Sequence, residues 1–224
     1  MSAADVLRKV PLFSDLSEAD LASFADVTRE REYPKNSVIL FEDDPGDSLY
    51  IVSAGQVKVV LIGEDGREVI LSVLGDGDFF GEMALIDDEP RSAHVIAMKD
   101  SQLLVLRRDD FQAQVAGHPQ IALKLLKVMV QRLRRADEKI GGLVLLDVNG
   151  RVARLLLDLA DESGGPRITR RLTHHTIAQM IGSSRETVSR AMRELVERGL
   201  IETTRREISI TNRDGLASLA GART

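Results

Sequence analysis

The chain has 224 residues, 43% hydrophobic and 29% charged, which is the composition of an ordinary globular protein rather than a disordered one. It has no cysteine, which excludes disulfide bonds, cysteine-ligated zinc and iron–sulfur clusters. No apolar run approaches the roughly 20 residues of a membrane span, and residues 1–10 lack the apolar core of a signal peptide, so we expect a cytoplasmic protein without a membrane partner.

The net charge of −5 conceals an asymmetry along the chain. Residues 1–146 carry 25 acidic and 17 basic side chains, whereas residues 147–224 carry 10 acidic side chains and 13 arginines. Arginine has the planar, multidentate group that suits phosphate and guanine. A GC-rich genome would also favour arginine codons, so the asymmetry supports DNA contact by the last third without proving it.

A helix start and a run of short strands occupy the first half of the chain. Ser17 is the predicted N-cap of a helix, with Asp20 at the capping-box position. From about residue 33 to residue 107 short apolar segments alternate with turn residues, and Asp65-Gly66 is a strong hairpin signal. This pattern predicts a β-barrel or jelly roll. The clearest expected strands are 48–52, 58–62, 68–71, 93–98 and 102–106.

Residues 80–95 combine the groups that would hold a small anion. Gly81 lets the backbone approach a ligand closely, and a helical turn from Glu82 would present its first amides to a phosphate. Arg91 would supply the countercharge, Ser92 a hydroxyl, and Glu82 an acceptor for a ribose hydroxyl. Each residue alone also fits an ordinary surface loop, so the spacing by itself is a weak signal.

After Asp109 the apolar period becomes helical. Apolar residues recur at alternating steps of four and three, the a/d seam of a coiled coil over three heptads. A helix over 119–146 would be about 42 Å long, so we expect a dimerisation helix; the alternative is a helix packed on its own barrel. The seam is Ala122, Leu126, Met129, Leu133, Ala136, Ile140 and Leu143, with dimer contacts expected from Met129 onward.

Residues 146–150 interrupt the seam, and we place the domain hinge there. Asp147 is predicted to cap the next helix, over 151–159. Further along, segments 200–204 and 207–210 predict a hairpin that is followed by a short tail.

Between the hinge and the hairpin lies the pattern of a helix-turn-helix. Thr173 is predicted to cap a first helix, and Gly182 follows it where a left-handed residue is needed. Ser183 is predicted to cap a second helix, with Glu186 three residues on. A lone helix of this kind would be interpreted as solvated, with Glu186 merely a capping residue, but the first helix, the turn and the hairpin together favour a winged helix-turn-helix that binds DNA.

The second helix has two unlike faces. At 100° per residue, one face is apolar and the other carries three arginines, a glutamate and a serine. Arginine bonds guanine O6 and N7 in bidentate fashion, and glutamate accepts from cytosine N4. The apolar face holds Thr187, Val188, Ala191, Met192 and Leu195, and the polar face Arg185, Glu186, Ser189, Arg190 and Arg193.

The whole chain resembles the cyclic-AMP receptor protein / fumarate–nitrate regulator (CRP/FNR) family of bacterial transcription regulators, most closely the catabolite activator protein branch. The resemblance is carried by the cassette at 81–93, the hinge at 146–151 and the run from Ser184 to Arg190, which occur in the family's order. It implies an α+β fold with three parts. These are a cyclic-nucleotide-binding β-jelly-roll barrel over 1–118, a dimerisation helix over 119–146 and a DNA-binding winged helix-turn-helix over 147–224.

The resemblance also implies partners and roles. The partners are cAMP as allosteric ligand with no further cofactor, a second copy of the chain, double-stranded DNA and RNA polymerase. Ligand binding would tighten or lengthen the helix seam and reorient the recognition helices over a TGTGA-like palindrome. The implied ligand residues are Gly81, Glu82 (ribose 2′-OH), Met83, Arg91 and Ser92 (cyclic phosphate), Ala93, Arg132 (linking cassette and helix), Ala136 and Asp137. The implied DNA contacts are Thr173, Ser184, Arg185, Glu186, Ser189, Arg190, Arg193 and, in the wing, Arg205.

Two departures from the family pattern matter. A Thr-Ser pair that contacts the adenine amino group in that branch is replaced by Ala136-Asp137. Asp137 can only accept, so it would take one bond from adenine or two from guanine; it fits a solvated helix acid equally well. The wing lacks the usual turn glycine, so we expect a longer or distorted tip.

Other functions are compatible with part of this pattern. The same fold could respond to cGMP, cyclic di-GMP or no nucleotide, or act as a nucleotide-sensing module with a protein partner. The arginine-bearing helix argues against the last. The four histidines, His94, His118, His174 and His175, show neither metal nor triad spacing, so we expect no enzyme and no metal site.

Overall fold

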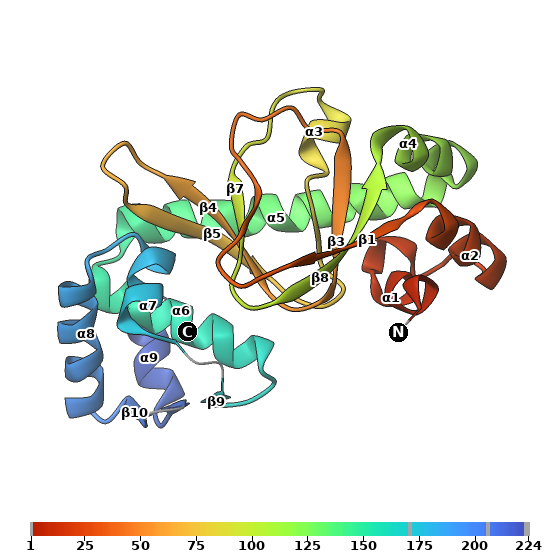
Figure 1. The fold of residues 1–224 in the computed structure, drawn as a ribbon. Helices are drawn as coiled ribbons and strands as arrows, with labels where there is room; N and C mark the ends of the chain where they lie inside the picture. The colour runs from red at the N-terminus through yellow and green to blue at the C-terminus, as the bar shows by residue number, and fades with distance from the viewer. Residues whose placement is uncertain (1, 170–171, 205–206, 222–224) are drawn as a thin grey trace. The chain divides into compact units, whose positions relative to one another are not determined.

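The structure is a computed structural model that describes residues 2–169, 172–204 and 207–221. It consists of two compact units, Met1–Arg132 and Leu133–Thr224, and Figure 1 shows the order of their elements. Helix α5 (Pro119–Leu145) contains the boundary between the units.

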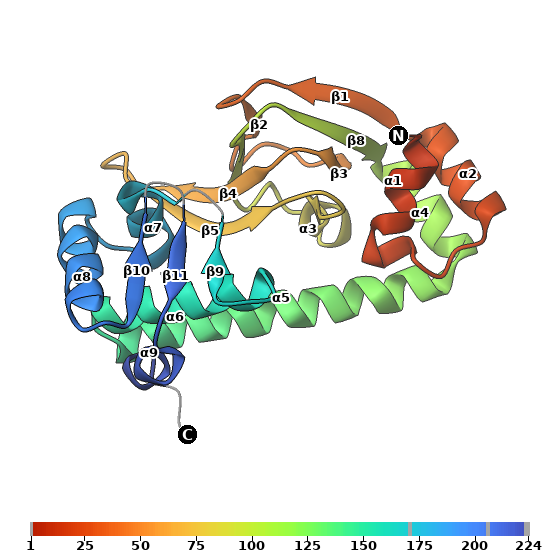
Figure 2. The same cartoon turned by 90° about the horizontal axis from the view of Figure 1, so that it is seen from below.

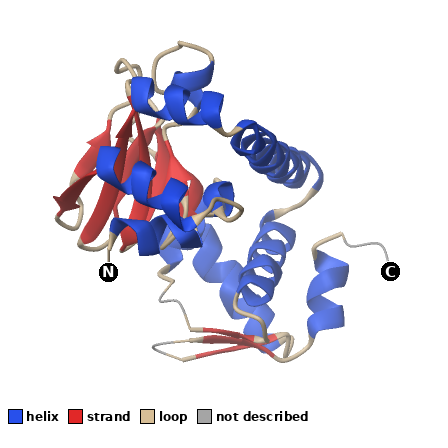
Figure 3. Ribbon diagram, turned by 90° about the vertical axis from the view of Figure 1, so that its right-hand side faces the viewer, coloured by secondary structure: helices blue, strands red, loops and turns tan. Residues whose placement is uncertain are grey.

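The first unit is an antiparallel β-roll with helices at both ends of its sequence. Its sheets have the strand orders β1-β8-β3-β6 and β2-β7-β4-β5, and Figure 3 shows their strands in red. The elements are α1 (Ala3–Lys9), η1 (Pro11–Phe13), α2 (Glu18–Val27), β1 (Arg29–Tyr33), β2 (Val38–Leu40), β3 (Ser48–Ala54), β4 (Val57–Ile62), β5 (Glu68–Leu74), β6 (Phe79–Phe80), α3 (Met83–Ile86), β7 (His94–Ala97), β8 (Ser101–Arg107) and α4 (Arg108–Gly117), followed by the start of α5.

Two apolar cores stabilise this unit. One lies between the sheets and includes Val52, Val57 and Leu103, all without exposed surface. The other joins α1, η1, α2 and α4 to one sheet around Phe13 and Phe24, whose ring centroids lie 4.8 Å apart. Burial of such side chains is worth about 1.5–3 kcal/mol each.

Helix α5 presents two different apolar faces. Ile121 and Leu125 are buried in the helical core of the first unit. Leu126, Leu133 and Ile140, from the predicted seam, are each 59–62% exposed within this single chain. The helix therefore does pack on its own β-roll, as in the alternative prediction, mainly through residues outside the seam, although Met129 of the seam is partly buried against the same core.

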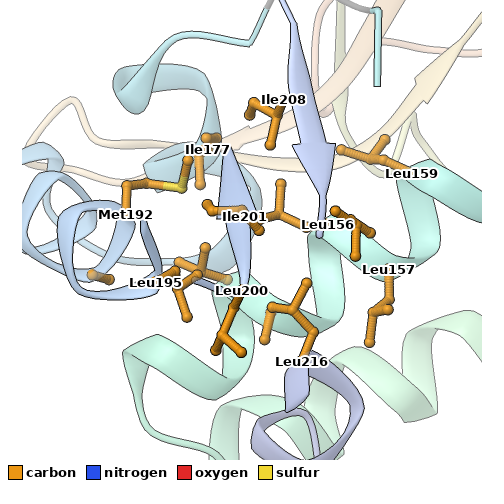
Figure 4. Close-up of a cluster of buried hydrophobic side chains, with 14 of the residues drawn as sticks. Leu156, Leu157, Leu159, Ile177, Met192, Leu195, Leu200, Ile201, Ile208 and Leu216 are labelled. Carbon is orange, nitrogen blue, oxygen red and sulfur yellow. The ribbon is translucent and has the colours of Figure 1, made fainter. Parts of the chain in front are cut away.

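The second unit contains the helix-turn-helix and its wing. Its small sheet has the order β10-β11-β9, which Figure 2 shows beside α6. Its core gathers side chains from α6, α7, α8 and the wing strands, among them Leu156, Ile177 and Leu195 (Figure 4). The elements after α5 are α6 (Val148–Glu162), β9 (Arg167–Ile168), α7 (His174–Ile181), α8 (Arg185–Glu197), β10 (Ile201–Thr203), β11 (Ile208–Ile210) and α9 (Arg213–Leu219).

The α+β architecture of β-roll, long helix and winged helix-turn-helix is the one predicted, but two local details are not. Helix α6 begins at Val148 rather than residue 151, although Asp147 caps it as expected through a 2.8 Å bond from the Gly150 N–H. The tail, for which the sequence predicts no element, holds α9, capped by Asn212. At the wing, the Thr204 N–H donates to the Glu207 carbonyl at 2.9 Å; residues 205–206 between them lie outside the described residues, so the expected longer or distorted tip stays a prediction.

Candidate functional site

The segment from Gly81 to Ser92 gathers polar groups in the first unit, and we use the name cradle for this segment together with the Ser48 and Phe79 carbonyls and Arg132 that contact it. Gly81 has φ +83°, and a Cβ there would lie 2.6 Å from Arg91 Nη1 and 3.0 Å from the Ser48 carbonyl oxygen. Only glycine fits such a backbone and such a contact. The expected helical turn after Glu82 is present as α3, four residues long.

Arg91 is held inside the cradle by backbone carbonyls. Its side chain donates from Nη1 to the Gly81 oxygen at 2.7 Å and from Nη2 to the Ser48 oxygen at 2.8 Å. The residue is 4% exposed, and its guanidinium lies 5.9 Å from the centroid of the Tyr50 ring. Burial lowers the pKa of this guanidinium, because a charged group loses hydration there. The cradle therefore offers a fixed, poorly hydrated positive charge.

Glu82 and Arg132 form an ion pair at the same place. Glu82 is 2% exposed, and its Oε1 accepts from Arg132 Nη1 at 2.7 Å. Arg132 also donates from Nη2 to the Phe79 oxygen at 2.6 Å and lies 4.9 Å from the centroid of that ring. The predicted link between the cassette and the long helix is thus a direct contact within the first unit.

Two buried polar atoms of this cradle lack a partner. Glu82 Oε2, an acceptor, and Arg91 Nε, a donor, make no hydrogen bond with any residue that the structure describes. Orphaned buried groups are rare, and each costs about 1–3 kcal/mol. A ligand that brings both a hydroxyl and an anionic oxygen would satisfy the two together.

The other expected ligand residues differ in burial and do not all lie at the cradle. The Ser92 hydroxyl donates to Met83 Sδ at 3.6 Å, a weak bond at an exposed position. The Ala93 side chain is buried, 6% exposed, directly before β7. Ala136 and Asp137 are exposed on α5 in the second unit, and their assignment to the ligand stays a prediction.

In the second unit the first helix of the helix-turn-helix begins and ends as predicted, at Thr173 and Gly182. The Thr173 hydroxyl accepts from the Thr176 N–H at 3.0 Å, and Gly182 is left-handed with φ +63°. The turn is also held by Arg151, whose Nη1 donates to the Ile181 oxygen at 2.9 Å. The sequence assigns no function to this arginine, since its partner is a main-chain atom.

The cap of α8 corrects one prediction. Ser184, not Ser183, is the N-cap, and its hydroxyl accepts from the Thr187 N–H at 3.1 Å. Glu186 is therefore the second helical residue rather than a capping-box partner, and its side chain is exposed. This shift removes the interpretation of Glu186 as a mere cap.

The two faces of α8 are those predicted. Its apolar side packs into the core of the unit, where Figure 4 shows Met192 and Leu195. Arg185, Arg190 and Arg193 are exposed on the other side, with Ser189 partly buried. Arg205 of the wing lies outside the described residues. The outward face of α8 is thus rich in hydrogen-bond donors, and its arginines are not packed into the core of the unit.

Two residues at the cradle carry no functional signal in the sequence. Ser48 contributes only its carbonyl oxygen, and Arg108 lies 16 positions beyond Ser92 at the start of α4.

Within the described part of the chain, no group of histidine, aspartate and glutamate side chains could hold a metal. No described helix is long and apolar enough to cross a membrane.

Comparison with known proteins agrees with this geometry. Residues 30–118 match the family model of the cyclic nucleotide-binding domain, and residues 150–219 match that of the Crp-like helix-turn-helix domain. The chain is 33% identical over 221 residues to the CRP-like cAMP-activated global transcriptional regulator of Mycobacterium tuberculosis, covering 96% of this chain and 99% of that protein. It is 36% identical over 191 residues to the cyclic AMP receptor protein of Thermus thermophilus, covering 85% and 88%.

A solved structure extends the comparison to the fold. The c-di-GMP responsive global regulator CLP of Xanthomonas campestris superimposes with a TM-score of 0.75 at 25% identity, covering 87% of this chain and 99% of that one. The family resemblance inferred from the motifs is thereby confirmed. This chain belongs to the CRP/FNR family of DNA-binding transcription regulators and carries the cyclic nucleotide-binding domain of that family.

Proposed function

We propose that this chain is a homodimeric transcription regulator that binds cAMP in the cradle and a TGTGA-like palindrome through α8. The observation that carries the nucleotide half is the pair of unpartnered buried atoms, Glu82 Oε2 and Arg91 Nε, which find no hydrogen-bond partner among the described residues. A cyclic nucleotide has a ribose hydroxyl to donate to the first and an anionic phosphate to accept from the second. Ser92 adds a hydroxyl for the phosphate, since its present bond to sulfur is weak.

The Glu82–Arg132 pair supports this assignment. Arg132 Nη1 donates to Oε1 at 2.7 Å, which leaves Oε2 as the carboxylate oxygen available to a ligand hydroxyl. Because Arg132 is on α5, a ligand that engages Glu82 acts on the residue that anchors the long helix. That connection is the physical basis for an allosteric signal from nucleotide to helix.

The base is assigned to adenine. The mycobacterial and Thermus relatives carry cAMP in their names, whereas the Xanthomonas relative is named for c-di-GMP. The counter-argument is Asp137, an acceptor that would suit guanine. A response to cGMP, to cyclic di-GMP or to no nucleotide is the alternative.

DNA reading is assigned to the exposed face of α8. Arg185 and Arg190 have the donors for guanine, and Glu186, free of any capping role, has the acceptor for cytosine. Thr173 and Ser184 lie at helix starts, where phosphate contacts position a protein on the duplex. We also assign Arg205 of the wing to a contact with the phosphate backbone of DNA, a contact that positions the protein without reading sequence.

The homodimer is assigned to the seam of α5. Leu126, Leu133, Ile140 and Leu143 are each 54–62% exposed although they repeat at a/d spacing. A row of large apolar side chains on one helix favours burial against a second copy. A regulator of this kind acts in the cytoplasm, with RNA polymerase as its final partner.

The test is calorimetric titration with cAMP, cGMP and cyclic di-GMP, repeated as DNA binding in the presence of each. The Arg91→Leu variant should lose nucleotide binding while keeping a folded β-roll, since a charge-assisted bond is worth about 1.5–3 kcal/mol. Arg67→Leu, at an exposed hairpin residue, is the matched control and should bind as the wild type does. Unchanged affinity in a folded Arg91→Leu protein would overturn the cradle assignment.

A further inference from the structure

Arg108, the first residue of α4, contacts two other segments at the cradle, the β2–β3 loop and the stretch from Ala84 to Asp88. Its Nη2 donates to the Gly46 oxygen at 2.6 Å and to the Ala84 oxygen at 2.7 Å. Its Nη1 pairs with Asp88, and its own N–H donates to the Asp47 oxygen at 2.7 Å. The side chain is 23% exposed, so these are contacts of a largely covered group.

The Gly46 and Ala84 carbonyls lie on two segments that approach each other closely. A Cβ on Gly46 would lie 2.3 Å from the Ala84 Cβ and 3.0 Å from Arg91 Nε. Gly46 is therefore a close-approach glycine, and the loop between β2 and β3 lies against both α3 and Arg91. The same loop pairs with Arg91 through main-chain bonds of 2.9 Å at Asp43 and Asp44.

The segments that Arg108 ties together are the segments that hold Arg91. Arg91 donates to the Ser48 oxygen, two residues after Gly46, and to the Gly81 oxygen, three residues before Ala84. If the two segments move apart, Arg91 loses one of its two carbonyl partners, and Nε no longer stays in its present position. Arg108 thus holds together the two segments whose carbonyls accept hydrogen bonds from Arg91.

We propose that Arg108 is a positioning residue of the nucleotide site, which holds the β2–β3 loop against α3 and thereby orients Arg91 toward the ligand. This inference rests on the nucleotide-binding function proposed for the cradle. The geometry of the side chain matters more than its charge, because Arg108 Nη2 bridges two carbonyls, which the planar guanidinium permits and a lysine ammonium reproduces poorly. The ion pair with Asp88, a carboxylate 80% exposed, contributes little.

The adjacent Arg107 is a matched control. It has the same charge and lies one position earlier in the chain, but its side chain is exposed and forms no hydrogen bond or ion pair with any described residue. Substitutions at the two positions change the net charge of the unit equally. A difference in nucleotide affinity between the Arg108 variants and the Arg107 variants therefore reports the contacts of Arg108.

The experiment compares Arg108→Gln and Arg108→Lys with Arg107→Gln and Arg107→Lys by calorimetry and stopped-flow with the cyclic nucleotide that the wild type binds. Both Arg108 variants should bind about tenfold more weakly, mainly through faster dissociation, because bonds from a charged donor are lost. Both Arg107 variants and Asp88→Asn should stay near the wild type. Hydrogen exchange without nucleotide should be faster at residues 43–48 in Arg108→Gln than in Arg107→Gln.

The outcomes separate the two proposals. If Arg91→Leu loses binding but Arg108→Gln binds like Arg107→Gln, the inference falls and the proposed function stands. If Arg108→Lys binds like the wild type, the charge and not the bridging geometry matters, and the inference is again overturned. If the wild-type chain binds no cyclic nucleotide, the proposed function falls first. Melting curves of Arg108→Lys identify a variant that is weak only because it is unfolded.

Discussion

Removing Arg132 should leave a buried carboxylate uncompensated. In Arg132→Met the apolar contact with the Phe79 ring is largely kept, but Glu82 loses its charged partner and the Phe79 oxygen loses a donor. The Glu82 side chain is 3% exposed and that of Arg132 34% exposed. The cost therefore lies between the 3–5 kcal/mol of a fully buried pair and the 0–1 kcal/mol of a surface pair, at about 2–3 kcal/mol.

The assay can be confined to the first unit. The chain has no tryptophan and two tyrosines, Tyr33 and Tyr50, both within the β-roll. Urea unfolding followed by tyrosine fluorescence therefore reports the unit that holds the pair, and the free energy of unfolding of the variant should fall by that amount. Arg134→Met, at an exposed position on the same helix, is the matched control.

A second variant separates the lost charge pair from lost packing. Glu82→Gln combined with Arg132→Met removes the buried charge, so it should recover most of the lost stability. The reasoning is refuted if Arg132→Met unfolds at the same urea concentration as Arg134→Met, or if the double variant is no more stable than Arg132→Met. Neither result depends on the nucleotide.

Three further predictions concern the helices. Arg185→Ala should cost about 1–3 kcal/mol on the preferred site and relax choice at one base pair; a uniform loss across a randomised site library would contradict base reading. Leu133→Asp should yield monomers in sedimentation, whereas Leu123→Asp, 64% exposed outside the seam, should not; a monomeric wild type would refute the dimer. Asp137→Ala should change the cAMP/cGMP affinity ratio several-fold, by the roughly 1–3 kcal/mol of an unpaired amide; an unchanged ratio would make Asp137 a solvated helix acid.

The elements that could be predicted from the sequence are those determined by neighbours along the chain. Ser17 and Asp20 form their capping box, and Gly182 adopts the left-handed turn, because each needs only residues within one helical turn. The shift from Ser183 to Ser184 at α8 shows the limit of this reasoning. Both serines can cap, and the choice depends on which hydroxyl reaches the Thr187 N–H.

Strand β1 is not predicted by the sequence pattern, for a different reason. Its residues, Arg29 to Tyr33, are mostly charged and show no apolar alternation. They form a strand because they pair with β8, from Arg29 opposite Val105 to Tyr33 opposite Ser101. Charged residues suit this position, since β1 is at the edge of its sheet, where charge discourages pairing with other chains.

The cradle shows most clearly which contacts a sequence pattern does not reveal. Arg91 and Glu82 can be identified because their side chains belong to a motif, but the atoms that orient Arg91 are main-chain carbonyls of Ser48 and Gly81. Every residue has a carbonyl, so no pattern marks these two. The same holds for Arg108, whose acceptors are also backbone atoms on segments far from it in the chain.

This difference has a consequence for the site. A binding motif can be assigned from its charged side chains, yet the position of those charges depends on which backbone segments the fold brings together. In this β-roll, the close approach at Gly46 places one segment within reach of two arginines. Arg91 is buried and donates to the Ser48 and Gly81 carbonyls, and Arg108 bridges the Gly46 and Ala84 carbonyls of the same two segments. Affinity for the nucleotide should then respond to substitutions outside the motif, at Gly46 and Arg108, as well as to those within it.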